Sequence, residues 1–140
     1  MSEIRLHTES FGELLLLPEV PCLLIRWHGF ANSYNLHLLL EKGLELYQHY
    51  APLYPGLGWL SDTRSFGAML PRDQEWAATD WNPRAYKVGL RELGFLVPDN
   101  IFGQIAIQRY EHNTAQRNYA LEVKYYASLE EACQYMAEER

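Results

Sequence analysis

The segment Ser61-Asp62-Thr63-Arg64-Ser65 holds the densest group of chemically versatile side chains in this sequence. It follows a short apolar run typical of a buried strand, and open α/β sheets place functional loops after such strands. A phosphate on Thr63 or Ser65 would add about two negative charges and would repel or recruit a partner. We therefore predict that Asp62, Thr63, Arg64 and Ser65 form a partner-binding or phosphorylation-switch loop. The alternative is an ordinary connection rich in hydroxyl groups.

The other polar residues show no catalytic or metal-binding pattern. No two of the five histidines have HxxxH spacing, and neither cysteine is adjacent to a histidine. Gly56-Leu57-Gly58 precedes a strand, whereas a phosphate-binding loop follows one, and no serine or cysteine stands in a nucleophile elbow. The sequence thus predicts no catalytic residue, no metal and no cofactor. An enzyme built on His28, Asp62 and Arg64 is the least favoured hypothesis.

Aromatic side chains make up 14% of the sequence. Tyr47, Tyr50 and Tyr54 fall together around the end of an expected helix, and tyrosine is enriched where a surface meets a partner. The tryptophans favour a place in the core, where large aromatic residues contribute most burial, but they also fit a ligand cage. We retain Tyr47, Tyr50, Tyr54 and Trp81 as candidate ligand or interface aromatics.

The charge balance excludes several classes of partner. The 140 residues include 12 Lys and Arg against 18 Asp and Glu, a net charge of −6, and the basic residues are scattered. Proteins that bind nucleic acid or an anionic membrane present a basic face, so we expect neither as a partner. Residues 1–5 lack the basic start and apolar run of a signal peptide. We expect one cytoplasmic domain over residues 1–140, for which a homodimer is also compatible.

Two cysteines, Cys22 and Cys133, lie on the apolar sides of an expected strand and an expected helix. Free cysteine is among the most buried residue types. We therefore expect two reduced thiols in the core, with a disulfide or redox pair as the alternative.

Three strands are expected at the start of the chain. Alternating or apolar runs at residues 4–8, 14–17 and 22–27 are separated by turn residues, which predicts an antiparallel meander. An amphipathic helix follows. Gly43 lies on its apolar face, where the missing side chain permits close approach to the sheet.

The second half of the chain alternates short strands with helices. Strands are expected at residues 57–60, 93–97 and 119–125, the last toward a sheet edge. A helix from Pro71 is expected to break at Asn82-Pro83, because proline lacks a backbone donor and clashes with the preceding turn. The polar stretch 111–117 is predicted as a loop. The resulting order, βββαβααβαβα, indicates an α/β fold with a mixed sheet of four to five strands and flanking helices.

The segments PRDQEW, residues 71–76, and DWNPRA, residues 80–85, resemble the small bacterial STAS/SEC14-type proteins, also called SpoIIAA-like. Looser similarity extends from about residue 21 to the C-terminus. The resemblance implies a mixed sheet of four to five strands flanked by helices. STAS regulators are switched by serine phosphorylation at the start of the helix after a central strand, and that place corresponds here to residues 63–65.

These observations together predict a non-enzymatic regulatory or protein-interaction module with an unknown protein partner. The alternative is a domain that binds a small apolar ligand in an aromatic-lined pocket. The first hypothesis rests on the missing catalytic patterns, the fold and the loop after Leu60, and the second on the Trp and Tyr residues that would line the pocket.

Overall fold

The computed structural model describes residues 2–116 and 121–139, which fold around one mixed sheet. Its six strands lie in the spatial order β1-β2-β3-β4-β5-β6. They are β1 (Ile4–Glu9), β2 (Gly12–Leu17), β3 (Cys22–Trp27), β4 (Gly58–Asp62), β5 (Glu92–Leu96) and β6 (Glu122–Tyr126). The α/β class is confirmed. The expected count of four to five strands is too low, because both outermost strands pair with a neighbour in the same sheet.

The sheet has an antiparallel half and a parallel half. β1, β2 and β3 form the predicted antiparallel meander, and β3 to β6 run parallel. β6 is the edge strand expected at this end. Of the strand predicted at 119–125, residues 119 and 120 lie outside the described part of the chain.

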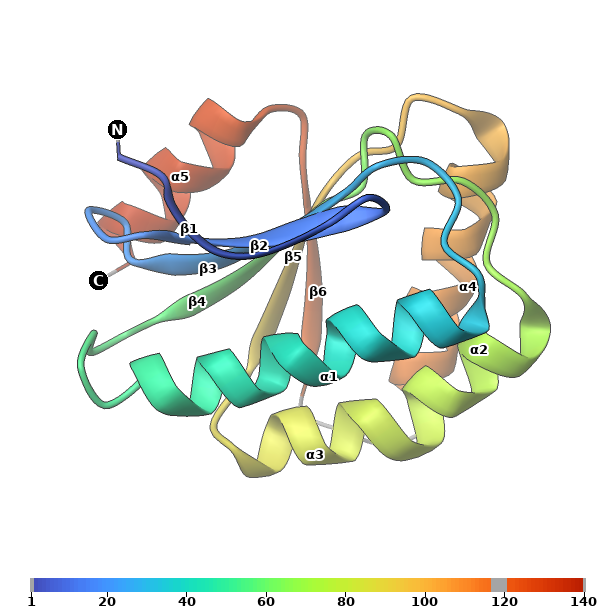
Figure 1. Cartoon of the computed structure of the whole chain (residues 1–140), viewed down its shortest axis with the longest axis horizontal. Helices are drawn as coiled ribbons and strands as arrows, with labels where there is room; N and C mark the ends of the chain where they lie inside the picture. Colours follow the sequence, from blue (N-terminus) through green and yellow to red (C-terminus); the bar gives the residue numbers. More distant parts are fainter. Residues whose placement is uncertain (1, 117–120, 140) are drawn as a thin grey trace.

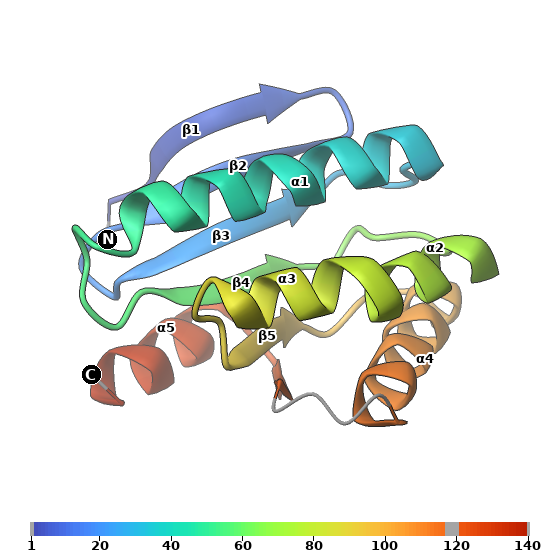
Figure 2. The ribbon, with the colours of Figure 1, turned by 90° about the horizontal axis from the view of Figure 1, so that it is seen from below.

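The helices cover the two faces of the sheet unequally, as Figures 1 and 2 show. Each connection between parallel strands leads to the next strand on the same side of the previous one. Because such connections share one handedness, their helices lie on the same face of the sheet. That face carries every described helical element except the last, and the last helix lies alone on the other face. The helices are α1 (Ser33–Tyr50), α2 (Pro71–Trp76), the π-helical turn η1 (Ala77–Trp81), α3 (Asn82–Lys87), α4 (Ile101–Gln116) and α5 (Leu129–Glu138).

Apolar side chains are buried on both sides of the central strands. Leu23, Ile25 and Trp59 join the larger core under α1, α3 and α4. Leu24 and Leu60 join a smaller core under α5. A strand with two buried faces has a continuous apolar run rather than an alternating one, which explains the uninterrupted leucines of β2.

The expected helix break at Asn82-Pro83 is wrong. Both residues lie within a continuous helical segment that passes from α2 through η1 into α3, so the order has one helix there instead of two. The Asn82 N–H donates to the Ala77 carbonyl, five residues earlier, which makes a π-helical turn directly before the proline. This wider turn accommodates the Pro83 ring, whose clash with a preceding carbonyl would break a regular α-helix.

The predicted loop at residues 111–117 is also wrong over its described part. α4 continues to Gln116, and Arg117 lies outside the described residues. Within this last part of α4, Thr114 is buried, and its hydroxyl accepts a hydrogen bond from Asn82 Nδ2 at 2.8 Å. The Tyr110 hydroxyl donates to Asn82 Oδ1. These polar contacts attach α4 to α3 in a way that sequence periodicity does not reveal.

Gly43 has the role that the sequence predicts. A Cβ at this position would lie 2.5 Å from Cη2 of Trp59, far inside van der Waals contact. The absence of a side chain therefore lets α1 approach β4, although glycine costs helix stability of about 1 kcal/mol relative to alanine.

Substitution Asn82→Ala should lower the free energy of unfolding by about 2–3 kcal/mol. It removes two buried hydrogen bonds and leaves the Tyr110 hydroxyl without its acceptor. Urea unfolding measures the change. Thr79→Ala is the control, since its exposed hydroxyl bonds only a carbonyl of its own helix, and it should shift stability by less than about 0.5 kcal/mol. Equal effects of the two variants would refute the role given to Asn82.

Candidate functional site

Three loops meet at the carboxyl ends of the parallel strands. They are residues 28–32 after β3, 63–70 after β4 and 97–100 after β5, here called the carboxyl-edge loops. The Gly29 N–H donates to the Ser65 carbonyl at 2.8 Å, and the Asp99 N–H donates to the Arg64 carbonyl at 3.1 Å. Asn100 Nδ2 donates to the Phe66 carbonyl at 2.8 Å. These bonds hold the three loops together as one surface.

The predicted switch segment lies partly inside the protein. Asp62 is the last residue of β4, and both Asp62 and Thr63 are buried. The Thr63 hydroxyl donates to the Leu96 carbonyl at the end of β5. Only Arg64 and Ser65 are exposed. The segment is therefore exposed only over its second half, because the parallel sheet continues through Asp62.

Asp62 is the centre of an ion-pair network on the face of the sheet that carries α5. Its carboxylate accepts from Arg64 Nε at 2.9 Å and Nη2 at 2.7 Å, and from Arg26 Nε at 3.2 Å. Arg26 also pairs with Glu3 and Glu13. Burial alone would raise the pKa of Asp62, but the hydrogen bonds and charge of Arg64, with a bond from Arg26, outweigh burial and lower it. The network ties β2, β3 and β4 together and includes Glu3, the residue before β1.

Large apolar side chains are exposed on the carboxyl-edge loops and on the helix starts beside them. Phe30, Ile101 and Phe102 are 60%, 60% and 67% exposed. A groove of about 260 Å³ lies between α4 and β6, with Val97 and Tyr125 in its lining. We call the exposed set the apolar rim; it consists of Phe30, Leu70, Val97, Ile101, Phe102 and Ile105.

Contacts of neighbouring residues connect the segments that carry Phe30, Leu70 and Phe102. The Cα of Phe30 lies 3.7 Å from the position of a Cβ at Gly67. Gln74 Nε2 of α2 donates to the Ala106 carbonyl of α4 at 2.8 Å. Leu70 and Phe102 lie one helical turn before those two residues, at the starts of their helices. The rim therefore spans the starts of α2 and α4 and the loop after β3, at the right side of Figure 1.

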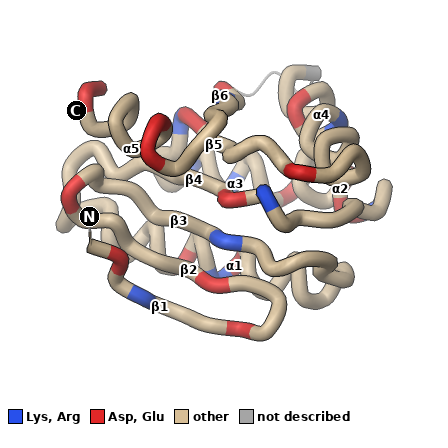
Figure 3. The backbone as a smooth tube through the Cα atoms, turned by 90° about the horizontal axis from the view of Figure 1, so that it is seen from above, with Lys and Arg blue, Asp and Glu red and all other residues tan. Residues whose placement is uncertain are grey.

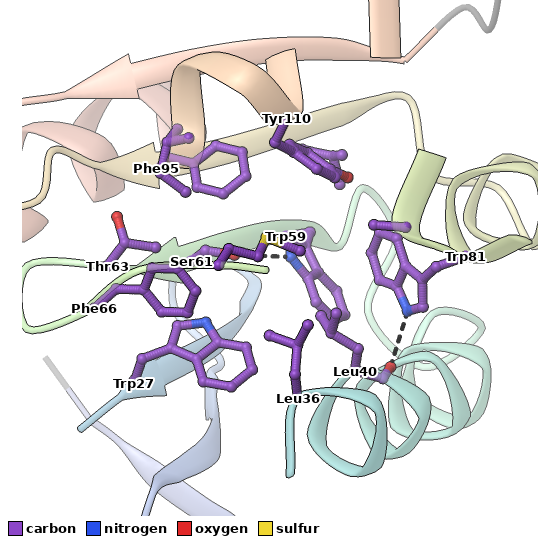
Figure 4. Close-up of a pocket in the computed structure, with 14 residues that line it drawn as sticks. Trp27, Leu36, Leu40, Trp59, Ser61, Thr63, Phe66, Trp81, Phe95 and Tyr110 are labelled. Atoms are coloured by element: carbon purple, nitrogen blue, oxygen red, sulfur yellow. Dashed lines mark hydrogen bonds between the residues drawn. The ribbon is translucent and has the colours of Figure 1, made fainter. Parts of the chain in front are cut away.

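An aromatic cavity lies beside the loop at residues 63–70, which contributes Phe66 to its lining (Figure 4). Its volume is about 50 Å³, and Trp27, Trp59, Phe66, Phe95 and Tyr110 contribute to its lining. The polar groups that face it are occupied: Trp59 Nε1 donates to Ser61 Oγ at 3.2 Å. A dry cavity of about 150 Å³ is needed to hold benzene, so this space is too small for an aromatic ligand without movement of its walls.

The aromatic residues singled out from the sequence do not form one surface. Trp81 is buried, and its Nε1 donates to the Leu40 carbonyl at 3.0 Å. Tyr47 is buried and donates to the Leu57 carbonyl. Tyr50 and Tyr54 are half-buried, with ring centroids 6.3 Å apart. Of these four side chains, none joins the apolar rim.

Tyr47 also lines a second cavity, of about 330 Å³, at the amino ends of β4 and β5. The cations in its lining already have partners. Arg91 Nη1 donates to the carbonyls of Tyr86 and Leu90. Lys124 Nζ donates to the Tyr135 hydroxyl at 2.6 Å and lies 3.5 Å from Glu92. This cavity thus has ligand size, while its charged groups serve the protein itself.

A Ser-Asp-His cluster, which sequence spacing did not reveal, joins α1 to α2. Asp73 is buried; its Oδ2 accepts from Ser33 Oγ at 2.8 Å, and its Oδ1 lies 3.1 Å from His37 Nε2. The His37 ring stacks on Trp76 at 3.7 Å. In a nucleophilic triad the histidine lies between the other two residues, whereas here the aspartate does. The serine is therefore not activated, and the cluster is a polar contact between helices.

Charged residues are interspersed along the chain, as Figure 3 shows, and Lys and Arg do not gather on one element. Among the described residues, His, Cys, Asp and Glu form no group of three or more that could hold a metal ion. None of the helices in residues 2–116 and 121–139 is both long and apolar enough to cross a bilayer.

No family model, no curated protein and no solved structure matches this chain. The resemblance to SpoIIAA-like proteins therefore stays a prediction. The site is described by its own geometry: an apolar rim, a small aromatic cavity and a satisfied ion-pair network.

Substitution Asp62→Asn should lower the free energy of unfolding by about 3 kcal/mol at pH 7, because it leaves Arg64 without its carboxylate and removes one of the three carboxylates that pair with Arg26. A carboxylate with a lowered pKa stabilises the fold fully above its unfolded pKa, near 3.8, and loses that contribution as pH falls through the folded pKa. The difference from wild type should thus stay constant from pH 7 to about pH 5 and shrink below pH 4. Urea unfolding at each pH measures it, with the exposed Asp80→Asn as control. A difference that grows on acidification would contradict the network.

Proposed function

We propose that this protein is a non-enzymatic protein-interaction module that binds an apolar segment of a partner protein through the apolar rim. The exposure of Phe30 on the loop after β3, and of Ile101 and Phe102 at the start of α4, carries the proposal. Soluble monomers rarely leave large apolar side chains grouped on the surface unless the surface binds something. Aromatic anchors are also the residues that contribute most binding energy at interfaces.

The polar groups near the rim favour binding over catalysis. The Thr63 hydroxyl, the Asp62 carboxylate and the Asp73 carboxylate are each engaged in internal hydrogen bonds. A catalytic group has to be free to exchange a proton with a substrate or attack it. Within the described residues, these groups serve to hold strands and helices in place.

The alternative function, binding of a small apolar ligand, has less support. Among the described residues, the aromatic cavity holds about 50 Å³, and the groove between α4 and β6 holds about 260 Å³. Ligand pockets for drug-sized molecules measure about 300–1,000 Å³. A ligand would have to displace part of the loop at residues 63–70, including Phe66.

Substitutions Phe30→Ser and Phe102→Ser should each weaken partner binding at least about tenfold, since each removes a large apolar contact. A tagged protein purified from its native host, followed by mass spectrometry, identifies the partner, and titration calorimetry measures the affinity. Leu53→Ser is the matched control. Leu53 is 64% exposed but lies between α1 and β4, at the amino ends of the parallel strands and so at the opposite end from the carboxyl-edge loops.

Both rim variants should keep the wild-type stability within about 0.5 kcal/mol, because their side chains are exposed. Sedimentation at several concentrations separates binding of a second copy from binding of another protein. Capture of the same proteins at the same affinity by wild type, Phe30→Ser and Phe102→Ser would overturn the proposal.

Ser65 offers a way to regulate this surface. It is exposed, and its carbonyl accepts the Gly29 N–H at 2.8 Å, which places it beside Phe30. We expect a negative charge here to disfavour an apolar partner, because the charge would lose water on binding. Ser65→Asp should therefore reduce partner affinity several-fold without changing stability by more than about 0.5 kcal/mol. Ser65→Asn has nearly the same shape without the charge and should bind like wild type. Equal binding by both variants would make this segment a connector only.

A further inference from the structure

Cys22 and Cys133 come from elements far apart in the sequence and meet in the smaller core. Cys22 begins β3, and Cys133 lies in the middle of α5. Neither is in a disulfide, and the two side chains are exposed to 0% and 5%. Their side chains are hydrogen-bonded to each other. Both residues belong to the same buried cluster under α5, and a disulfide joins two sulfur atoms at about 2.05 Å.

The surroundings of Cys22 and Cys133 favour thiol–disulfide exchange. The hydrogen bond from Cys22 lowers the pKa of Cys133, against the opposing effects of burial and of Glu3. A lowered pKa increases the fraction of thiolate, which is the nucleophile in thiol–disulfide exchange. Cys133 thus has the character of the attacking residue and Cys22 that of the resolving one.

α5 gives an oxidant access to these buried atoms. It is a ten-residue helix near the C-terminus and lies alone on its face of the sheet (Figure 2). Its buried contacts come from Ala132, Cys133 and Met136. Terminal elements with few buried residues open locally at lower free-energy cost than the rest of the fold. Opening of α5 exposes Cys133 without unfolding the sheet.

We propose that Cys22 and Cys133 are a redox modification site that forms an intramolecular disulfide on exposure to a small-molecule disulfide. The Cys133 thiolate attacks one sulfur of the oxidant, forms a mixed disulfide and releases one thiolate. The Cys22 thiolate then attacks Cys133 Sγ and releases the second thiolate. The two cysteines lose two electrons and two protons in total, and the oxidant is reduced to two thiols. The product bonds α5 covalently to β3.

The test uses the reduced full-length protein in native buffer with oxidised glutathione. Intact-mass spectrometry should show the loss of two hydrogens in a monomeric species, and proteolysis should yield one peptide pair linked through Cys22 and Cys133. The melting temperature should rise by about 10 °C, because the bond closes a long loop. Dithiothreitol should reverse both changes.

Two variants identify the roles of the thiols. Cys22→Ala should stop at the mixed disulfide between Cys133 and glutathione, whereas Cys133→Ala should react much more slowly, since the attacking thiol is missing. The wild-type result stands even if a variant folds poorly. Thiols that stay reduced in the folded wild type, a final product that is a mixed disulfide, or a disulfide between two chains would each overturn the proposal. None of these results depends on the apolar rim.

Discussion

Burial of β2 and β3 on both faces of the sheet is the constraint on which the rest of this structure depends. The leucines of β2 alternate between the larger core under α1 and the smaller core under α5, and each core needs its helices to exclude water. Three crossovers in one direction supply helices to one face only. The other face of the sheet is therefore covered by α5. This helix packs on the apolar side chains of that face, which form the smaller core. Beyond α5, that face carries Arg26 and Asp62, whose charges are paired with each other.

Several elements could be predicted from the sequence because their signals are local. Alternating or apolar runs with turn residues between them predicted the meander of β1 to β3, and Gly43 on an apolar helix face predicted the close contact with Trp59. Local rules failed where distant residues decide the backbone. Pro83 remains helical because η1 widens the preceding turn. The polar end of α4 remains helical while Thr114 bonds Asn82, 32 residues earlier in the chain.

The candidate site also has features that could be predicted from the sequence and features that could not. The position of Arg64 and Ser65 after β4 followed from the order of the strands, whereas the burial of Asp62 and Thr63 depends on pairing between β4 and β5. The apolar rim could not be predicted, because Phe30 comes from the loop after β3 and Ile101 from the start of α4, and they show no periodicity together. Single exposed apolar residues are common on protein surfaces, and only the backbone bonds between the loops bring these residues together.

The π-helical turn also changes how substitutions and deletions are tolerated along this helical segment. A π turn contains one residue more than an α turn over the same length, so η1 behaves as a one-residue insertion within a regular helix. Deletion of one residue from Ala77–Trp81 would restore regular winding there. It would also rotate all of α2 by about 100° relative to α3. Asp73 would then leave Ser33, and Gln74 would leave α4. The extra residue therefore fixes how α2 is rotated relative to α3. In this rotation α2 contacts α1 and α4 while α3 covers the sheet.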